Sequence, residues 1–229
     1  MRARRTLFLA GAAVAVAAVI GAGTQATAGP VDVRSAGVAA DQLTDHDLRS
    51  ALTPMTDIAP GTTMTQQTIA EAIEQLQMPK NLVITPAVCT YLVDLSGLDG
   101  WTQTGVTPDG HFQQSLFGVQ PGGLDLDKIR ANAESCTNGT ISVPEAGLTG
   151  TITLTEFAVP KVDGIDAVGI KQVVSFGGDK SDTAVQLEKM SSTQLYLTAG
   201  DLGGIICEEL PVRTDFAQAM QERMKALVG

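Results

Sequence analysis

The chain has 229 residues, enough for one domain with a buried core, and 44% of them are hydrophobic. Aromatic residues make up only 4%, so the core must be mainly aliphatic. The formal net charge of -10 at pH 7 argues against nucleic acid or an anionic membrane surface as a partner, because either would repel the protein.

The first 28 residues have the pattern of a secretory signal peptide. Arg2, Arg4 and Arg5 form a positive start, residues 7–20 are apolar, and residues 26–28 (Ala-Thr-Ala) match a cleavage site. The two adjacent arginines partly match a twin-arginine signal, so both export routes stay open. No later stretch approaches the ~20 apolar residues of a membrane span. We therefore expect a secreted, extracytoplasmic protein with no stable membrane insertion after cleavage.

Residues 29–42 are small and polar without periodicity, which indicates a flexible leader, and we expect residues 43–229 to form a single domain. Regularly spaced leucines at its start indicate a short first helix or turn. Thr44 is a candidate cap for this helix, with Asp47 three residues later in place of the usual Glu.

The next part of the chain predicts two helices and an edge strand. Residues 65–76 place apolar side chains at helical spacing, which favours a short amphipathic helix. Residues 82–84 could form an edge strand. Thr85 and Pro86 are suited to the N-cap and the first turn of a second helix, which would end before Gly97.

The middle of the chain alternates between strand-like and helix-like patterns. A Pro-Asp-Gly turn at residues 108–110 separates two strand-like runs. Asp125 could cap a helix with Leu126, Ile129 and Ala133 on its inward face. The expected elements are a strand from Trp101 to the turn, a strand over 111–119, a helix over 125–136, and strands over 140–143 and 150–157.

The last third reads as a meander of four short strands separated by Gly or Asp turns. An amphipathic helix over residues 214–228, with Thr214 as its cap, would cover one face of this sheet. Together these patterns predict an α+β fold with a central antiparallel sheet and helices packed mainly on one face. The four expected strands span 169–176, 183–190, 193–199 and 204–210.

The order of these segments resembles that of a known group of proteins. The matching features are the TPAVC helix start at 85–89, the Leu-Asp-Leu run at 124–126, Cys136, the strands after Gly169 and the closing helix. The layout over residues 43–229 is similar to that of exported actinobacterial proteins, many of them lipoproteins, related to the extracellular sensor domain of mycobacterial serine/threonine kinase H. This resemblance implies an α+β domain with a disulfide and a cleft for an unknown ligand.

The three cysteines permit one disulfide, whereas the kinase sensor that the chain resembles has two. Cys89 and Cys136 lie on expected helical segments, and Cys207 lies in an apolar strand, where a buried thiol is usual. We therefore prefer a Cys89–Cys136 bridge and leave the two pairings of Cys207 open. Glu208 and Glu209 would raise the pKa of Cys207, which argues against a nucleophilic role.

No catalytic, cofactor or metal site is visible in the sequence, and we expect none. His46 and His111 are the two histidines, both in polar segments, and neither accompanies a GxSxG motif or a metal-ligand spacing. The carboxylates around the meander lack the spacing of a calcium loop, so we interpret them as turn residues. These carboxylates belong to Asp163, Asp166, Asp179, Asp182 and Asp201.

These features favour a non-enzymatic, sensor-like envelope domain that binds an unknown small ligand or an envelope protein. A secreted hydrolase with a dispersed active site is one alternative, and it would place His46 or His111 in a pocket beside a serine and a carboxylate. A structural envelope protein is another, and it would show an exposed apolar patch without a pocket.

Overall fold

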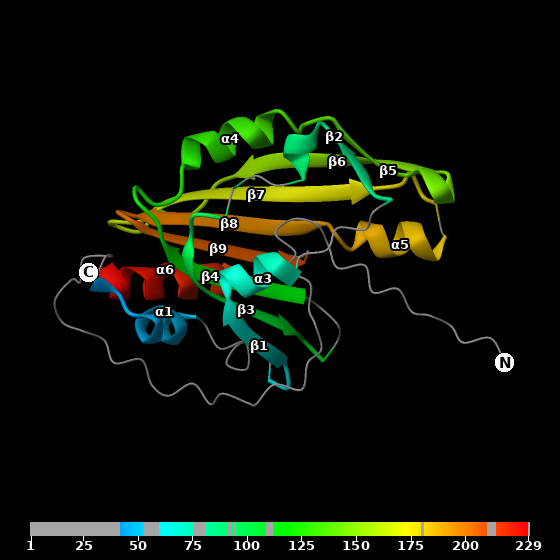
Figure 1. The fold of residues 1–229 in the computed structure, drawn as a ribbon. Helices are drawn as coiled ribbons and strands as arrows, with labels where there is room; N and C mark the ends of the chain where they lie inside the picture. The colour runs from blue at the N-terminus through cyan, green and yellow to red at the C-terminus, as the bar shows by residue number, and fades with distance from the viewer. Residues whose placement is uncertain are drawn as a thin grey trace.

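The computed structural model describes residues 42–52, 60–75, 81–90, 93, 95–108, 112–179, 181–209 and 214–228. Its centre is a nine-stranded sheet with the order β1-β3-β4-β9-β8-β7-β6-β5-β2, in which all neighbours are antiparallel (Figure 1). The described residues also form five α-helices. The predicted α+β class with a central antiparallel sheet is therefore confirmed.

The last strands of the chain lie at the centre of the sheet, and its first two strands form the two edges. The strands are β1 (Thr63–Thr68), β2 (Val83–Thr85), β3 (Asp99–Val106), β4 (Phe112–Val119), β5 (Gly139–Val143), β6 (Leu148–Phe157), β7 (Asp166–Ser175), β8 (Ser192–Ala199) and β9 (Leu202–Glu209). The helices are α1 (Asp45–Ala51), α3 (Ile69–Gln75), α4 (Leu126–Glu134), α5 (Asp182–Glu188) and α6 (Thr214–Val228), with 3-10 turns η2 (Ala87–Cys89) and η3 (Pro144–Ala146).

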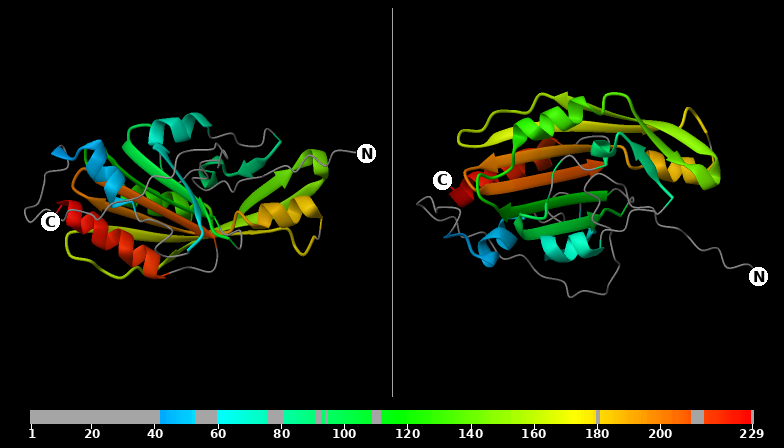
Figure 2. Two further views of the ribbon diagram at one scale, coloured as in Figure 1. Left: turned by 90° about the horizontal axis from the view of Figure 1, so that it is seen from below. Right: turned by 45° about the horizontal axis from the view of Figure 1, so that its top comes forward.

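Helices cover both faces of the sheet, which twists strongly along its width (Figure 2). On one face, called here the α4 face, residues of α3, α4 and α5 join the inward side chains of the strands in one apolar cluster, with Ile129 and Leu187 as examples. On the opposite face, the α6 face, α1 and α6 form a second cluster that includes Met220 and Met224. The helices are thus less one-sided than the sequence indicates, because α1 and α6 build a core of their own.

Several local predictions are confirmed by their capping contacts. At α1, the Thr44 backbone N–H donates to Asp47 Oδ2 at 2.9 Å, and the Asp47 N–H donates to Thr44 Oγ1 at 3.3 Å. At α4, Asp125 Oδ1 accepts from the Lys128 N–H at 2.9 Å. The edge strand at 82–84 is present as β2, and α6 packs against β8 and β9, as expected for the closing helix.

The expected strand over 183–190 is wrong, because this segment forms α5. Ser181 caps the helix by accepting the Ala184 N–H at 3.2 Å. Ala184 and Leu187 are three positions apart and both fully buried, so their apolar pattern is that of one helix face rather than of a strand. The meander therefore has three strands, β7, β8 and β9, with α5 in the first connection.

Two expected helices are shorter than the sequence indicates. Residues 63–68 pair with β3 as a strand, and helix α3 begins only at Ile69, where Thr68 and Glu71 form a capping box. The threonines of this segment suit a strand, so the helical spacing belongs only to its second half. Thr85 ends β2 instead of capping a helix, and the only helical turn described in the segment that follows is η2.

Two carboxylates held by local hydrogen bonds make the stability of the fold depend on pH in the acid range. Hydrogen bonds from Thr68 hold the pKa of Glu71 below its usual range, and hydrogen bonds from Ser181 do the same for Asp179. A lowered folded-state pKa contributes stability that is present above the unfolded-state value and lost as pH falls through the folded-state value. We expect the free energy of unfolding to fall below about pH 4, and Glu71→Gln to flatten part of that slope in denaturant titrations at several pH values. An unchanged slope in the variant would contradict this assignment.

Candidate binding site on the α4 face

A row of uncharged polar side chains crosses the centre of the α4 face. In register, Thr104 of β3 lies opposite Gln114 of β4, Gln114 opposite Cys207 of β9, and Cys207 opposite Gln194 of β8. Opposed residues of an antiparallel pair point to the same side, so these four side chains lie next to one another. All four are buried, and they are called here the polar row.

The polar row interrupts an otherwise aliphatic surface. One step along the same strands, Leu116, Ile205 and Tyr196 lie opposite one another and belong to the apolar cluster of this face. Burying an amide without a hydrogen bond costs roughly 1–3 kcal/mol in proteins, so every polar atom in this row needs a partner.

Within the described part of the chain, Gln114 has a partner for one end of its amide and none for the other. Thr102 donates its hydroxyl hydrogen to the Ser115 carbonyl oxygen at 3.1 Å, so Thr102 Oγ1 can only accept from Gln114 Nε2, which lies 3.1 Å away. This contact fixes the orientation of the amide. Gln114 is 2% exposed, and its Oε1 has no hydrogen-bond partner among the residues that the structure describes. The row therefore contains one buried acceptor that awaits a donor.

Gln194, in the same row, has partners at both ends of its amide. Its Oε1 accepts from the Tyr196 hydroxyl, and its Nε2 donates to Ser192 Oγ at 3.4 Å. Burial, with a smaller contribution from nearby Cys207, raises the pKa of Tyr196 well above its usual range, so the phenol stays protonated and remains a donor. Of the two glutamines in the row, Gln114 is thus the one whose amide lacks a hydrogen-bond partner at one end.

Among the described residues, two buried hydroxyls also lack partners, and both lie on the α6 face. They are Ser115 Oγ and Thr193 Oγ1, each buried. Ser115 lies opposite Ile206, and Thr193 lies opposite Glu208, which accepts from Gln113 Nε2. A Ser or Thr hydroxyl is a single rotatable group, whereas the Gln114 amide is fixed by its contact with Thr102. Of these three unpartnered groups, Gln114 Oε1 is therefore the strongest candidate for a hydrogen bond to a ligand.

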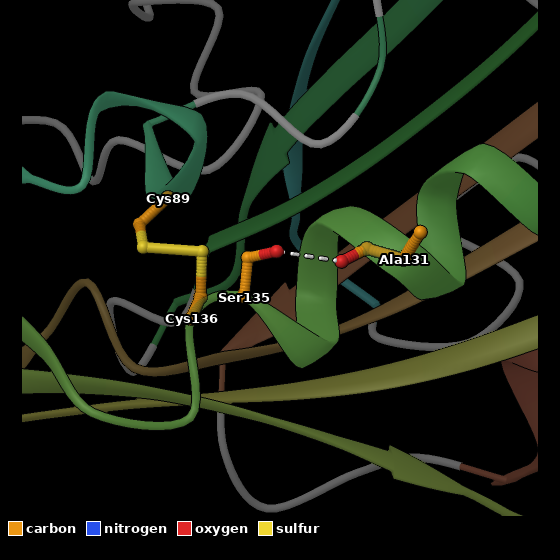
Figure 3. The surroundings of a disulfide bond; sticks show 4 residues. All are labelled: Cys89, Ala131, Ser135 and Cys136. Carbon is orange, nitrogen blue, oxygen red and sulfur yellow. Dashed lines mark hydrogen bonds between the residues drawn. A yellow bond between two sulfur atoms is a disulfide. The ribbon is translucent and has the colours of Figure 1, made fainter.

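The disulfide of the structure joins Cys89 and Cys136, the pairing that the sequence favours, with 5.5 Å between their Cα atoms (Figure 3). It links η2 to the end of α4, where the Ser135 hydroxyl donates to the Ala131 carbonyl at 2.9 Å. Both half-cystines belong to the apolar cluster of the α4 face. The bridge therefore holds η2 over the same face as the polar row.

The third cysteine, Cys207, is buried in the polar row and is not part of the disulfide. The expectation of a buried thiol in an apolar strand is confirmed for its burial, although its immediate neighbours across the strands are two glutamines. Its position makes it a chemical reporter for access to the row.

Those residues considered for catalysis or metal binding that the structure describes do not assemble into a site. His46 is exposed on α1, and His111 lies outside the described residues. Asp201 Oδ1 accepts from the Gly122 N–H at 2.8 Å, and Asp179 Oδ1 accepts from the Ser181 N–H at 2.7 Å, so both act as turn residues. Within the described ranges, no group of three or more His, Cys, Asp or Glu side chains could hold a metal ion.

Two further observations bear on the alternative functions. The exposed large apolar side chains come from five separate elements rather than from one: Ile73, Val83, Val106, Val173 and Val185. In the part of the chain that the structure describes, no helix combines the length and apolarity needed to cross a bilayer.

Sequence reasoning missed the polar row, because Gln114 and Gln194 look like ordinary solvent-facing residues of half-buried strands. The available signal was the alternation itself. In the run from Thr193 to Ala199, Gln194 and Tyr196 share one face while Leu195 and Leu197 share the other, so one side of this strand mixes polar and aromatic groups.

Comparison with solved structures gives matches that include two mycobacterial proteins. An uncharacterized protein from Mycobacterium smegmatis, described as the Rv0999 ortholog, has 12% identity and a TM-score of 0.45, covering 82% of this chain and 99% of its own. The extracellular domain of PknH from Mycobacterium tuberculosis has 9% identity and a TM-score of 0.46, covering 81% and 96%. The kinase sensor domain that the sequence resembles is thus one of the solved structures that match this chain. No protein-family model and no curated protein matches the sequence.

Proposed function

We propose that this protein is an extracytoplasmic binding domain that receives a small ligand at the polar row of the α4 face. The observation that carries the proposal is Gln114 Oε1, a buried and oriented acceptor without a partner. A native chain keeps such a group against a penalty of roughly 1–3 kcal/mol, and that penalty is removed when a ligand supplies the donor. The signal-like residues 1–28 support an extracytoplasmic location.

The polar row has the features expected of a recognition surface. Its side chains come from four adjacent central strands, which hold them rigidly and at fixed spacing. Apolar neighbours such as Leu116 and Ile205 surround it, so a ligand would find a few placed polar groups in an apolar lining. The described residues of the row include no nucleophile beside a base, so binding without chemistry is the function that this geometry supports best.

The proposal requires that small molecules can reach the row without unfolding the whole protein. Cys207 allows a direct test, because it is the thiol within the row and the other two cysteines form the disulfide. We expect iodoacetamide to alkylate Cys207 through a local opening, with a rate that depends only weakly on denaturant concentration. Intact-mass kinetics at increasing urea would measure this dependence, with Cys207→Ser as the control for background labelling.

The opposite result has an equally clear meaning. If the rate of Cys207 alkylation depends on urea as steeply as global unfolding does, the row is closed to small molecules in the folded protein and does not receive a ligand. A single buried water would then be the partner of Gln114 Oε1.

A further inference from the structure

The charges around the polar row restrict the chemistry of its ligand. Its four side chains are uncharged, as are their described neighbours Thr102, Tyr196, Gln172 and Ser192. A charged ligand would lose its hydration here without gaining an opposite charge from these groups. The net charge of -10 would also disfavour an anionic ligand at longer range.

The hydrogen-bonding capacity of the row restricts the ligand further. Gln114 Oε1 requires a donor, whereas the hydroxyl of Thr104 can both donate and accept. The two residues lie opposite each other on β3 and β4, about 5 Å apart. A ligand hydroxyl also donates and accepts at one atom, so a molecule with several neighbouring hydroxyls matches this arrangement, whereas an amide N–H can only donate.

We infer that the ligand of the polar row is a neutral, polyhydroxylated molecule of the saccharide class, which donates a hydroxyl hydrogen to Gln114 Oε1. This inference rests on the proposed function, since it names the ligand of the same site. Two other glutamines of this face bond within the protein. Gln194 accepts from the Tyr196 hydroxyl, and Gln172 Nε2 donates to the Met190 carbonyl at 2.7 Å.

The test compares saccharides that share one ring and differ in charge. Glucose is neutral, glucosamine is cationic and glucuronate is anionic, with mannose, arabinose and trehalose as further neutral probes. The cationic probe is included because Glu209 lies two residues beyond Cys207 on β9, opposite Ser192. The readout is the rate at which iodoacetamide alkylates Cys207 in the full folded chain. At about ten times its dissociation constant, a bound ligand should slow this reaction about tenfold.

A variant separates specific binding from general stabilisation by sugars, which are excluded from protein surfaces. Gln114→Met removes the acceptor while nearly keeping the side-chain length. We expect a neutral saccharide to protect Cys207 in the wild type and in Thr151→Ala, whose threonine is exposed on β6, and to give no protection in Gln114→Met. Equal protection in all three proteins would mean general stabilisation and would overturn the inference.

The remaining outcomes distinguish the ligand class from the function. Stronger protection by glucosamine or glucuronate than by any neutral probe overturns the neutral class and leaves the binding function in place. If no saccharide protects Cys207 while alkylation still proceeds through local opening, the saccharide class is overturned and the binding function stays in place. Alkylation only through global unfolding overturns both proposals.

Discussion

Replacing Cys89 and Cys136 by serine is expected to lower the free energy of unfolding by about 4 kcal/mol. The disulfide closes a loop with a sequence separation of 47 residues, and the loop-entropy relation gives about this value for a loop of that length. Both half-cystines are fully buried on the α4 face, so two polar hydroxyls would also enter an apolar cluster. Urea denaturation followed by circular dichroism would measure the change.

The matched control for the disulfide is Cys207→Ser, a buried cysteine outside the bridge. This variant makes the same change of sulfur to oxygen without loss of a crosslink. We expect it to lower the free energy of unfolding less than the double variant does, and the difference between the two measures the contribution of the bridge. If the double variant loses no more stability than this control, the Cys89–Cys136 bridge does not form in the folded protein.

Phe117→Ala is expected to lower the free energy of unfolding by about 3–5 kcal/mol, the usual range for removing a buried phenylalanine. Phe117 is 0% exposed on the α6 face, in the cluster that joins the sheet to α1 and α6. Its ring lies over Gly204, where an added Cβ would come within 2.7 Å of Phe117 Cε1. The neighbouring backbone is thus already in contact with the ring and cannot move inward to fill the cavity.

Val173→Ala is the control for Phe117→Ala, because Val173 points from β7 to the same side of the sheet but is 38% exposed. We expect a change within about 0.5 kcal/mol for this surface position. Similar losses in the two variants would show that the α6-face cluster is not a packed core.

The sequence predicted the elements whose signals are local. The caps at Thr44 and Asp125 depend on contacts three residues apart, and the apolar face of α4 depends on helical spacing, so both can be read without tertiary information. The strand prediction for 183–190 is wrong because it rests on the short length and apolar content of the segment, whereas Ala184 and Leu187 are three positions apart and fit one helix face. The Ser181 cap was the deciding signal, and it was not weighed.

The candidate site could not be predicted, because it arises from the register of strands that are distant in sequence. Gln114 and Gln194 are 80 positions apart in the chain and are brought together only through β9. Nothing in either local sequence distinguishes a satisfied amide from one that lacks a partner. That difference depends on Thr102 and Tyr196, which the strand pairing supplies.

The measurement that tests the central claim most directly is the free energy of unfolding of Gln114→Met beside Gln194→Met, in protein without added ligand. Gln114→Met removes an unpartnered acceptor together with one hydrogen bond to Thr102, so we expect a protein within about 1 kcal/mol of the wild type or more stable than it. Gln194→Met leaves the buried Tyr196 hydroxyl without its acceptor, so we expect a loss of about 2 kcal/mol or more. Equal losses in the two variants would show that Gln114 Oε1 is already satisfied in the unliganded protein, and would contradict the claim that the polar row awaits a ligand.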